Sequence, residues 1–186
     1  MVSMGNEAVA GNLKDIQLLI LDVDGVLTDG SLYFGSDGAE YKAFNARDGA
    51  AIRWWMRLGR EMAWITGRES PAVANRADNL GVKRVYQLAL RKLPVYESLL
   101  AELNISAENT AYIGDDLMDL PVMTRCGFAV AVADAAEEVR AAADLVTELP
   151  GGRGAVAETV RHLLQACGDW EKVMARYTGP QPEGSP

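Results

Sequence analysis

The sequence is poor in the residues on which many enzyme classes depend, since its 186 residues include one histidine and two cysteines. The single histidine, His162, cannot supply a multi-histidine metal site, and no serine or cysteine elbow motif lies beside it, which argues against the triad hydrolases. Cys126 and Cys167 have neither metal-ligand spacing nor a partnering motif, so we expect two reduced thiols. Because His162 falls in a helical pattern among apolar neighbours, we interpret it as a bystander.

Long apolar runs and an excess of basic charge are also absent. No stretch of about 18 apolar residues predicts a membrane-spanning helix, and residues 1–12 lack the basic and apolar regions of a secretory signal. We therefore expect a cytoplasmic protein without membrane insertion. The 18 Lys and Arg residues against 26 Asp and Glu residues give a net charge of −8, which argues against a nucleic-acid partner. An anionic substrate would need a local cluster of basic residues.

The apolar residues that are present, 49% of the chain, fit one globular domain with a sizeable core. Helical patterns separate most of the strand-like runs, which lie at 16–21, 61–65, 82–86, 110–113, 128–132 and 144–146. One helix is expected to start after Ser70-Pro71 and to stop at Gly81. This alternation predicts an α/β fold, a three-layer α/β/α Rossmann-like parallel sheet. We expect a flexible N-terminus over 1–12, a core over 13–167 and a C-terminal tail over 168–186 that begins with a short helix.

One insertion interrupts the alternation after the first strand. Residues 31–44 predict a β-hairpin, with strands at 31–34 and 39–44 and a glycine-flanked turn between them. A lone hairpin is marginally stable in water, so its apolar side chains need a surface to cover them. That surface is either the parent domain or the same hairpin of another subunit, and composition leaves both alternatives open.

The strongest chemical signal is the pair Asp22 and Asp24, which directly follows the first apolar run. In an open parallel sheet, ligands bind beyond the carboxyl ends of the strands. Two neighbouring carboxylates there favour a nucleophile and a bound divalent cation, and Mg²⁺ suits such a sparse set of oxygen ligands. The alternative is that Asp24-Gly25 only marks a turn after a strand.

Three later strand ends carry complementary side chains. Thr66-Gly67-Arg68 suits phosphate oxygens, Lys92 opens a helix whose positive end favours an anion, and residues 114–119 supply further acids. Each alone has an ordinary explanation as a turn, a solvated charge or a group of acids at a helix N-terminus. Their order, each after a strand, favours a phosphate-handling site.

The four motifs resemble those of the haloacid dehalogenase superfamily, which are Asp-x-Asp, Thr or Ser, Lys, and Gly-Asp with further acids. The resemblance implies that Asp22 is the nucleophile that forms an aspartyl-phosphate, while Asp24 protonates the leaving alcohol and then activates water. It also implies that Mg²⁺ is held by the side chains of Asp22 and Asp115 and by the Asp24 carbonyl. Thr66 and Lys92 would bind the phosphoryl group.

The gaps in which that superfamily carries a cap domain are short here. Residues 29–61 hold only the hairpin and one helix, and residues 67–91 hold one helix and one strand, so we expect no cap domain. A small substrate would then be open to bulk water, which weakens the electrostatics of the site. Either the substrate is macromolecular or neighbouring subunits close the site.

Longer segments at 22–30, 42–49, 65–68, 112–116 and 151–156 closely resemble the family of 3-deoxy-D-manno-octulosonate 8-phosphate phosphatases. This resemblance implies a Mg²⁺-dependent homotetramer of lipopolysaccharide synthesis that acts on a small sugar acid phosphate. Its hairpins would form a central barrel, and its C-terminal segments would help to cover a neighbour's site. The implied substrate contacts, whose guanidinium groups would bind carboxylate and phosphate, are Asp24, Asn45, Ala46, Arg47, Asp48, Gly49, Arg53, Arg68, Arg76 and Lys92.

Several alternatives stay open at this point. Arg53 and Arg76 fit a solvated helix face as well, and a nonulosonate 9-phosphate phosphatase would share the same capless, tetrameric plan. From a different class, a non-catalytic tetrameric assembly module is conceivable, although the intact motifs argue against it. One departure from the family is visible, because Leu88 stands after Tyr86-Gln87 where the family usually has glycine. We therefore expect the loop before Lys92 to be shaped differently.

Overall fold

A parallel sheet forms the centre of the protein in the computed structural model, which describes residues 13–179. Its six strands lie in the order β5-β4-β1-β6-β7-β8, and all neighbours are parallel. The bounds are β1 Leu18–Leu21, β4 Glu61–Ile65, β5 Arg84–Tyr86, β6 Thr110–Gly114, β7 Phe128–Ala131 and β8 Leu145–Val146. Every residue of β1 is buried, because a central strand covered on both faces has no contact with water.

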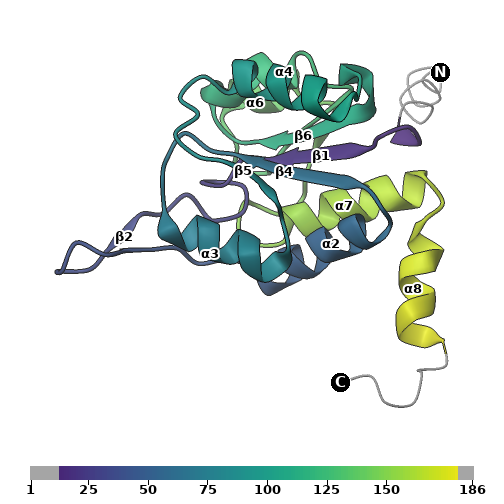
Figure 1. Ribbon diagram of the computed structural model, residues 1–186, viewed down its shortest axis with the longest axis horizontal. Helices are drawn as coiled ribbons and strands as arrows, with labels where there is room; N and C mark the ends of the chain where they lie inside the picture. The colour runs from purple at the N-terminus through teal and green to yellow at the C-terminus, as the bar shows by residue number, and fades with distance from the viewer. Residues whose placement is uncertain (1–12, 180–186) are drawn as a thin grey trace.

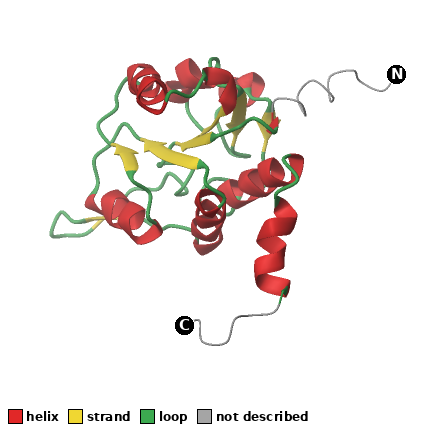
Figure 2. Ribbon diagram, turned by 45° about the vertical axis from the view of Figure 1, so that its right-hand side comes forward, coloured by secondary structure: helices red, strands yellow, loops and turns green. Residues whose placement is uncertain are grey.

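Helices cover both faces of this sheet (Figure 1), and Figure 2 shows the strands between two helical layers. One layer holds α2 (Ala46–Arg57), α3 (Pro71–Leu80) and α7 (Ala155–Ala166), and the other holds α4 (Lys92–Leu103), α5 (Leu120–Met123) and α6 (Glu137–Ala142). Two short 3-10 turns, η1 (Ala107–Asn109) and η2 (Leu117–Asp119), flank β6. The predicted three-layer α/β/α fold is confirmed, and the described residues contain no cap domain.

The register of β1 brings three strand ends together. Leu21 pairs with Trp64 of β4 and with Ile113 of β6, so the segments that follow these strands leave the sheet at one edge. Parallel strands all present their carboxyl ends on that side. The predicted acids Asp22 and Asp115 therefore start from neighbouring backbone positions.

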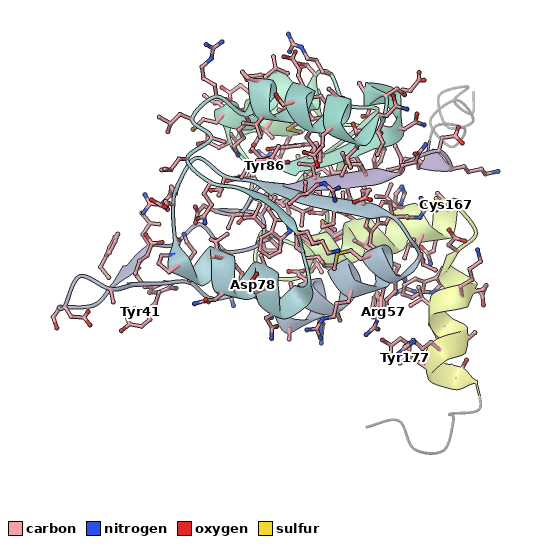
Figure 3. All side chains as sticks on the ribbon, in the orientation of Figure 1. Tyr41, Arg57, Asp78, Tyr86, Cys167 and Tyr177 are labelled. Carbon is pink, nitrogen blue, oxygen red and sulfur yellow. The ribbon has the colours of Figure 1, made fainter. Side chains whose placement is uncertain are left out.

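The hairpin insertion projects from the body of the molecule (Figure 1). β2 (Tyr33–Phe34) pairs with β3 (Glu40–Tyr41) in antiparallel register. Both strands are shorter than predicted, because no third strand extends the ladder. Tyr41 lies on the part of the chain that points away from the sheet (Figure 3). Leu32, Tyr33, Phe34 and Tyr41 stay 45% to 63% exposed, so the hairpin does not bury these four side chains on its own domain, whereas Phe44 at its end packs against the core.

The chain after α7 folds back on its own subunit as α8 (Trp170–Thr178). The rings of Trp54 and Trp170 meet edge to face with centroids 5.6 Å apart, and Trp54 Nε1 donates a hydrogen bond to Tyr177 Oη at 2.8 Å. The short helix predicted in the tail is therefore present and docked (Figure 3). The N-terminus expected to be flexible and the end of the tail, residues 1–12 and 180–186, lie outside the described residues. Within residues 13–179, no helix is long and apolar enough to cross a membrane.

Candidate active site

Asp22 begins the site, directly after β1. Its backbone N–H donates to the Ile113 carbonyl at 3.0 Å, which continues the β1–β6 ladder by one residue, and its side chain is almost fully buried. The chain then turns at Gly25, whose φ is +91°. A Cβ atom at Gly25 would overlap the Asp115 carboxylate. Glycine is therefore required for the turn and for the close approach of the acid that follows β6.

Lys92, the first residue of α4, lies buried between two carboxylates. Its Nζ is 2.7 Å from Asp22 Oδ1 and 2.6 Å from Asp119 Oδ1. Asp119 is completely buried and also accepts a hydrogen bond from Tyr112 Oη at 2.6 Å. Burial alone would lower the pKa of Lys92, but the two carboxylates outweigh it and raise this pKa above its ordinary value. The ammonium therefore stays charged where phosphoryl oxygens would need it.

Three acids at this edge offer oxygens that lie within 4.8 Å of one another, from Asp22, Asp115 and Asp119. Burial, followed by the charges of Asp22 and Asp119, raises the pKa of Asp115. Burial and the charge of Asp119 likewise raise the pKa of Asp22. Such a cluster of like charges has an excess of negative charge that a cation would offset.

Asp119 and Asp115 differ in their hydrogen bonds, and the difference indicates which of them is available to a cation. Asp119 uses Oδ1 for Lys92 and Tyr112, and Oδ2 for the backbone N–H groups of Asp115 and Asp116 at 3.0 and 3.2 Å. Asp115 Oδ1, in contrast, is buried and has no hydrogen-bond partner among residues 13–179. A divalent cation with hard oxygen ligands fits Asp22 and Asp115, while Asp119 orients the groups around them.

Asp24 lies two residues after Asp22, next to two basic side chains. It forms an ion pair with Lys42, which follows β3, and its Oδ2 is 3.9 Å from Arg68 Nε. Glu40 of β3 pairs with the same two cations, at 3.2 Å from Lys42 Nζ and 2.7 Å from Arg68 Nη2. The base of the hairpin is thus part of the site.

Thr66 follows β4 and is buried. Its backbone N–H donates to the Tyr86 carbonyl, and its carbonyl accepts from the Ala89 N–H, both at 2.9 Å. Thr66 Oγ1 also accepts from the Arg68 N–H at 3.3 Å. These bonds tie the loop after β4 to the loop that carries Lys92, so the two predicted phosphate-binding elements form one unit.

The segment 151–154 packs against the turn at Gly25 that follows Asp22. Gly152 donates its N–H to the Val26 carbonyl at 2.9 Å, and its carbonyl faces Asn45 Nδ2 at 3.4 Å. A Cβ atom at Gly151 would overlap the Gly25 carbonyl. Asn45, the N-cap of α2, also accepts from the Arg47 N–H at 2.8 Å, so the start of α2 is anchored to the same turn.

The other predicted substrate contacts fall into separate places. Arg76 donates to the Asn45 carbonyl at 3.3 Å and lies against Gly49, where a Cβ atom would overlap its guanidinium. Arg53 donates to the Asn79 carbonyl at 2.5 Å, so both arginines lie where α2 meets α3 rather than on the acid cluster. Ala46 opens α2.

Two further predicted contacts face away from the acid cluster. Asp48 is buried and accepts from the Ala157 N–H of α7 at 2.8 Å. Arg47 lines a groove between α2, α7 and α8 with Trp54 and Trp170. His162 lines this groove as well, with its ring stacked on Phe128 at 6.0 Å, which agrees with its interpretation as a bystander. Both cysteines are free thiols.

Comparison with known proteins identifies the family. A model of the haloacid dehalogenase-like hydrolases matches residues 84–159. The chain is 49% identical over 160 residues to the 3-deoxy-D-manno-octulosonate 8-phosphate phosphatase KdsC of Escherichia coli (strain K12), covering 86% of this chain and 85% of that protein. The chain belongs to this phosphatase family.

Solved structures of the family share the fold along most of the chain. The 3-deoxy-D-manno-octulosonate 8-phosphate phosphatase of Yersinia pestis superposes with a TM-score of 0.86 at 46% identity, over 88% of each chain. That of Moraxella catarrhalis, solved in complex with magnesium ion, phosphate ion and a KDO molecule, gives 0.90 at 36% identity, over 92% of this chain and 99% of that chain.

Some residues of this phosphatase's site were not predicted from the sequence. Asp119 lies in the acidic run that was noted, but its contact with Lys92 depends on how η2 follows β6. Glu40 carried no signal, because a charged residue in an exposed hairpin is ordinarily solvated. Lys42 begins the segment 42–49 that resembles the family, but it was not predicted as a site residue. Tyr112 looked like one more apolar strand residue, and only the fold shows its hydroxyl on Asp119.

Proposed function

We propose that this protein hydrolyses 3-deoxy-D-manno-octulosonate 8-phosphate to the free sugar acid and inorganic phosphate, with Mg²⁺ as cofactor, in lipopolysaccharide precursor synthesis in the cytoplasm. The observation that carries the proposal is the buried Asp22–Lys92–Asp119 array with Asp115 beside it. It stands at the strand ends of a chain that is about half identical to phosphatases of that name.

The chemistry assigned to this chain has two steps. In the first, an Asp22 carboxylate oxygen attacks phosphorus, the bond between phosphorus and the sugar C8 oxygen breaks, and Asp24 donates a proton to that oxygen. In the second, water attacks phosphorus, its proton passes to Asp24, and the acyl-phosphate bond to Asp22 breaks to release phosphate. Thr66 and Lys92 bind the phosphoryl oxygens in both steps.

The metal site is assigned to the side chains of Asp22 and Asp115 and the carbonyl of Asp24. Mg²⁺ bound there supplies positive charge that offsets the charge of the phosphoryl group. The unpartnered Asp115 Oδ1 and the raised pKa of Asp115 support this assignment. Asp119 is assigned as the residue that orients Lys92.

We assign binding of the sugar acid to three arginines. Arg68 lies beside Asp24. Arg53 of α2 contacts the Asn79 carbonyl near the end of α3, and Arg76 of α3 contacts the Asn45 carbonyl at the start of α2. Guanidinium groups suit the carboxylate of the sugar acid. The remaining assigned contacts, Asn45 to Gly49, lie on the same segment, and Asp48 and Arg47 act there through the conformation of α2.

We further propose that the protein is a homotetramer whose neighbours close the site. The exposed apolar side chains of the hairpin, together with the lack of a cap over the acids in the described residues, support this assembly. The C-terminal tail, residues 168–186, is the segment that we assign to a neighbouring subunit's site.

Phosphate release by the purified protein tests the function. We expect turnover of the eight-carbon 8-phosphate with Mg²⁺, its loss with EDTA, and lower activity on nine-carbon sialic-type 9-phosphates. D22N should lose at least about 10³-fold in kcat while keeping its circular dichroism spectrum and oligomeric state. A preference for the nine-carbon substrates would overturn the substrate assignment, and an active D22N would overturn the nucleophile.

A further inference from the structure

The Asp24 carboxylate is held by a closed ring of charges that begins in the hairpin. Lys42 pairs with Asp24 Oδ1 and with Glu40 Oε1, and Arg68 pairs with Glu40 Oε2 and approaches Asp24 Oδ2. The two acids and the two bases therefore alternate around the ring. Asp24 follows β1, Arg68 follows β4, and the other two belong to β3 and the residue after it.

Lys42 and Arg68 differ in burial, and this difference gives them different roles in the ring. The Lys42 side chain has no exposed surface, whereas the Arg68 side chain is 44% exposed. A buried ammonium is stable only with carboxylates in direct contact, so Lys42 must keep its ion pairs with Asp24 and Glu40. Arg68 can turn toward a substrate carboxylate while Lys42 keeps Asp24 in position.

The two oxygens of Asp24 also differ. Oδ1 is taken by Lys42, while Oδ2 is buried and has no hydrogen-bond partner among the described residues. Proton transfer requires one oxygen that is free and aimed at the reacting atom. The ion pair on Oδ1 fixes the carboxylate and leaves Oδ2, which is 3.9 Å from Arg68 Nε, as the oxygen without a hydrogen bond.

We propose that Lys42, supported by Glu40, is a positioning residue that holds Asp24 so that Oδ2 gives and takes the proton. This inference rests on the proposed function, since it concerns the acid–base group of the same reaction. Both ion pairs of the Lys42 ammonium are with carboxylates of the protein, those of Asp24 and Glu40, so we assign it a positioning role. A misplacement of about 1 Å in such a group can cost about 100-fold in rate. Because Glu40 and Lys42 come from the hairpin, the hairpin contributes to the rate through the position of Asp24.

The test compares K42M, K42R and the surface control K83M on two substrates with Mg²⁺. For the sugar 8-phosphate, K42M should lose about 100-fold in kcat with little change in KM, K42R should recover part of the loss, and K83M should match the wild type. With 4-nitrophenyl phosphate, the stable phenolate leaves without a proton, so the first turnover of K42M should stay fast while the steady state becomes slow.

Each outcome decides the proposal. An unchanged kcat in K42M, or an equal loss in the first turnover of both substrates, would overturn it. If K42M does not fold, E40Q replaces it as the test. E40Q should lose about 10-fold in kcat, because it weakens the ion pair that supports Lys42. D37N, in the same hairpin, is the matched control and should keep the wild-type kcat. A wild-type protein that is inactive on sugar phosphates but active on 4-nitrophenyl phosphate would overturn the substrate assignment. The comparison of first-turnover and steady-state rates on 4-nitrophenyl phosphate would still test the role of Lys42.

Discussion

Asp48 is a buried acid outside the cluster of Asp22, Asp115 and Asp119. Its Oδ1 accepts the Ala157 N–H at the start of α7, while its Oδ2 has no hydrogen-bond partner among residues 13–179. Burial raises the pKa of Asp48 from 3.8 to about 6, although the backbone N–H groups of α7 oppose the shift. The ionised form of Asp48 therefore lowers the stability of the folded state.

This cost makes stability depend on pH. Between pH 3.8 and about 6 the folded state binds more protons at Asp48 than the unfolded state does, so the contribution of this group to stability falls as the pH rises through that window. The neutral change D48N should raise the free energy of unfolding at pH 7 by about 1–3 kcal/mol and have little effect below about pH 4.

Denaturant unfolding at several pH values checks this prediction. The matched control is D78N, because Asp78 is exposed on α3 (Figure 3) and its loss should change stability by less than about 0.5 kcal/mol. A D48N protein that is less stable than the wild type at pH 7 would show that the hydrogen bond to α7 outweighs the cost of burial.

At the scale of elements, the connection from β5 to α4 decides where Lys92 lies. Leu88 has a φ of +58°, a backbone conformation that favours glycine, and this is the position at which the family usually has glycine. The loop is held in place by the Ala89 N–H on the Thr66 carbonyl. The loop therefore holds a 62% exposed leucine in a strained, left-handed conformation.

A pair of substitutions isolates this strain. L88G and L88A remove the same exposed side chain, but only glycine relieves the left-handed backbone, so L88G should be about 1 kcal/mol more stable than L88A. At Leu90, which is also exposed and is not in this conformation, the order should reverse because glycine adds entropy to the unfolded chain. Urea unfolding at one fixed protein concentration measures both pairs, and equal stabilities of L88G and L88A would exclude strain at Leu88.

At the scale of the whole molecule, the hairpin is the element in which the proposed tetramer contact and the proposed site meet. Its outward residues are apolar and exposed, among them Phe34 at 63%, while Glu40 and Lys42 at its base reach Asp24. A neighbouring subunit that covers the tip would therefore also restrain β3, which carries Glu40 and leads to Lys42, the side chain proposed to position Asp24.

We expect F34E to break the proposed tetramer and to lower kcat about 10-fold or more through the loosened hairpin, since a charge in an apolar interface costs several kcal/mol. Light scattering and phosphate release measure the two effects on the same sample. The control is S36E, which adds the same charge in the turn without removing apolar surface. A wild-type protein that is monomeric and fully active would contradict the subunit-closed site.

The sequence by itself determined the sheet, the strand ends and the order of the motifs. The run 61–65 is β4 residue for residue, and the helix after Ser70 ends at Gly81 as its capping residues require. These features are local, because apolar periodicity, caps and turn residues act within a few positions of the chain. For the same reason Asp22, Thr66, Lys92 and Asp115 could be selected before the fold was known.

Only the tertiary structure decided which side chains meet. It joined Lys42 to Asp24, turned Asp48 toward α7 rather than toward the acids, and left the hairpin's apolar side chains exposed. Contacts between segments far apart in the chain depend on strand order, register and loop geometry, and sequence periodicity specifies the buried face of an element but not its partner. The physical reason is that the charge state and orientation of a buried group are set by its neighbours in space.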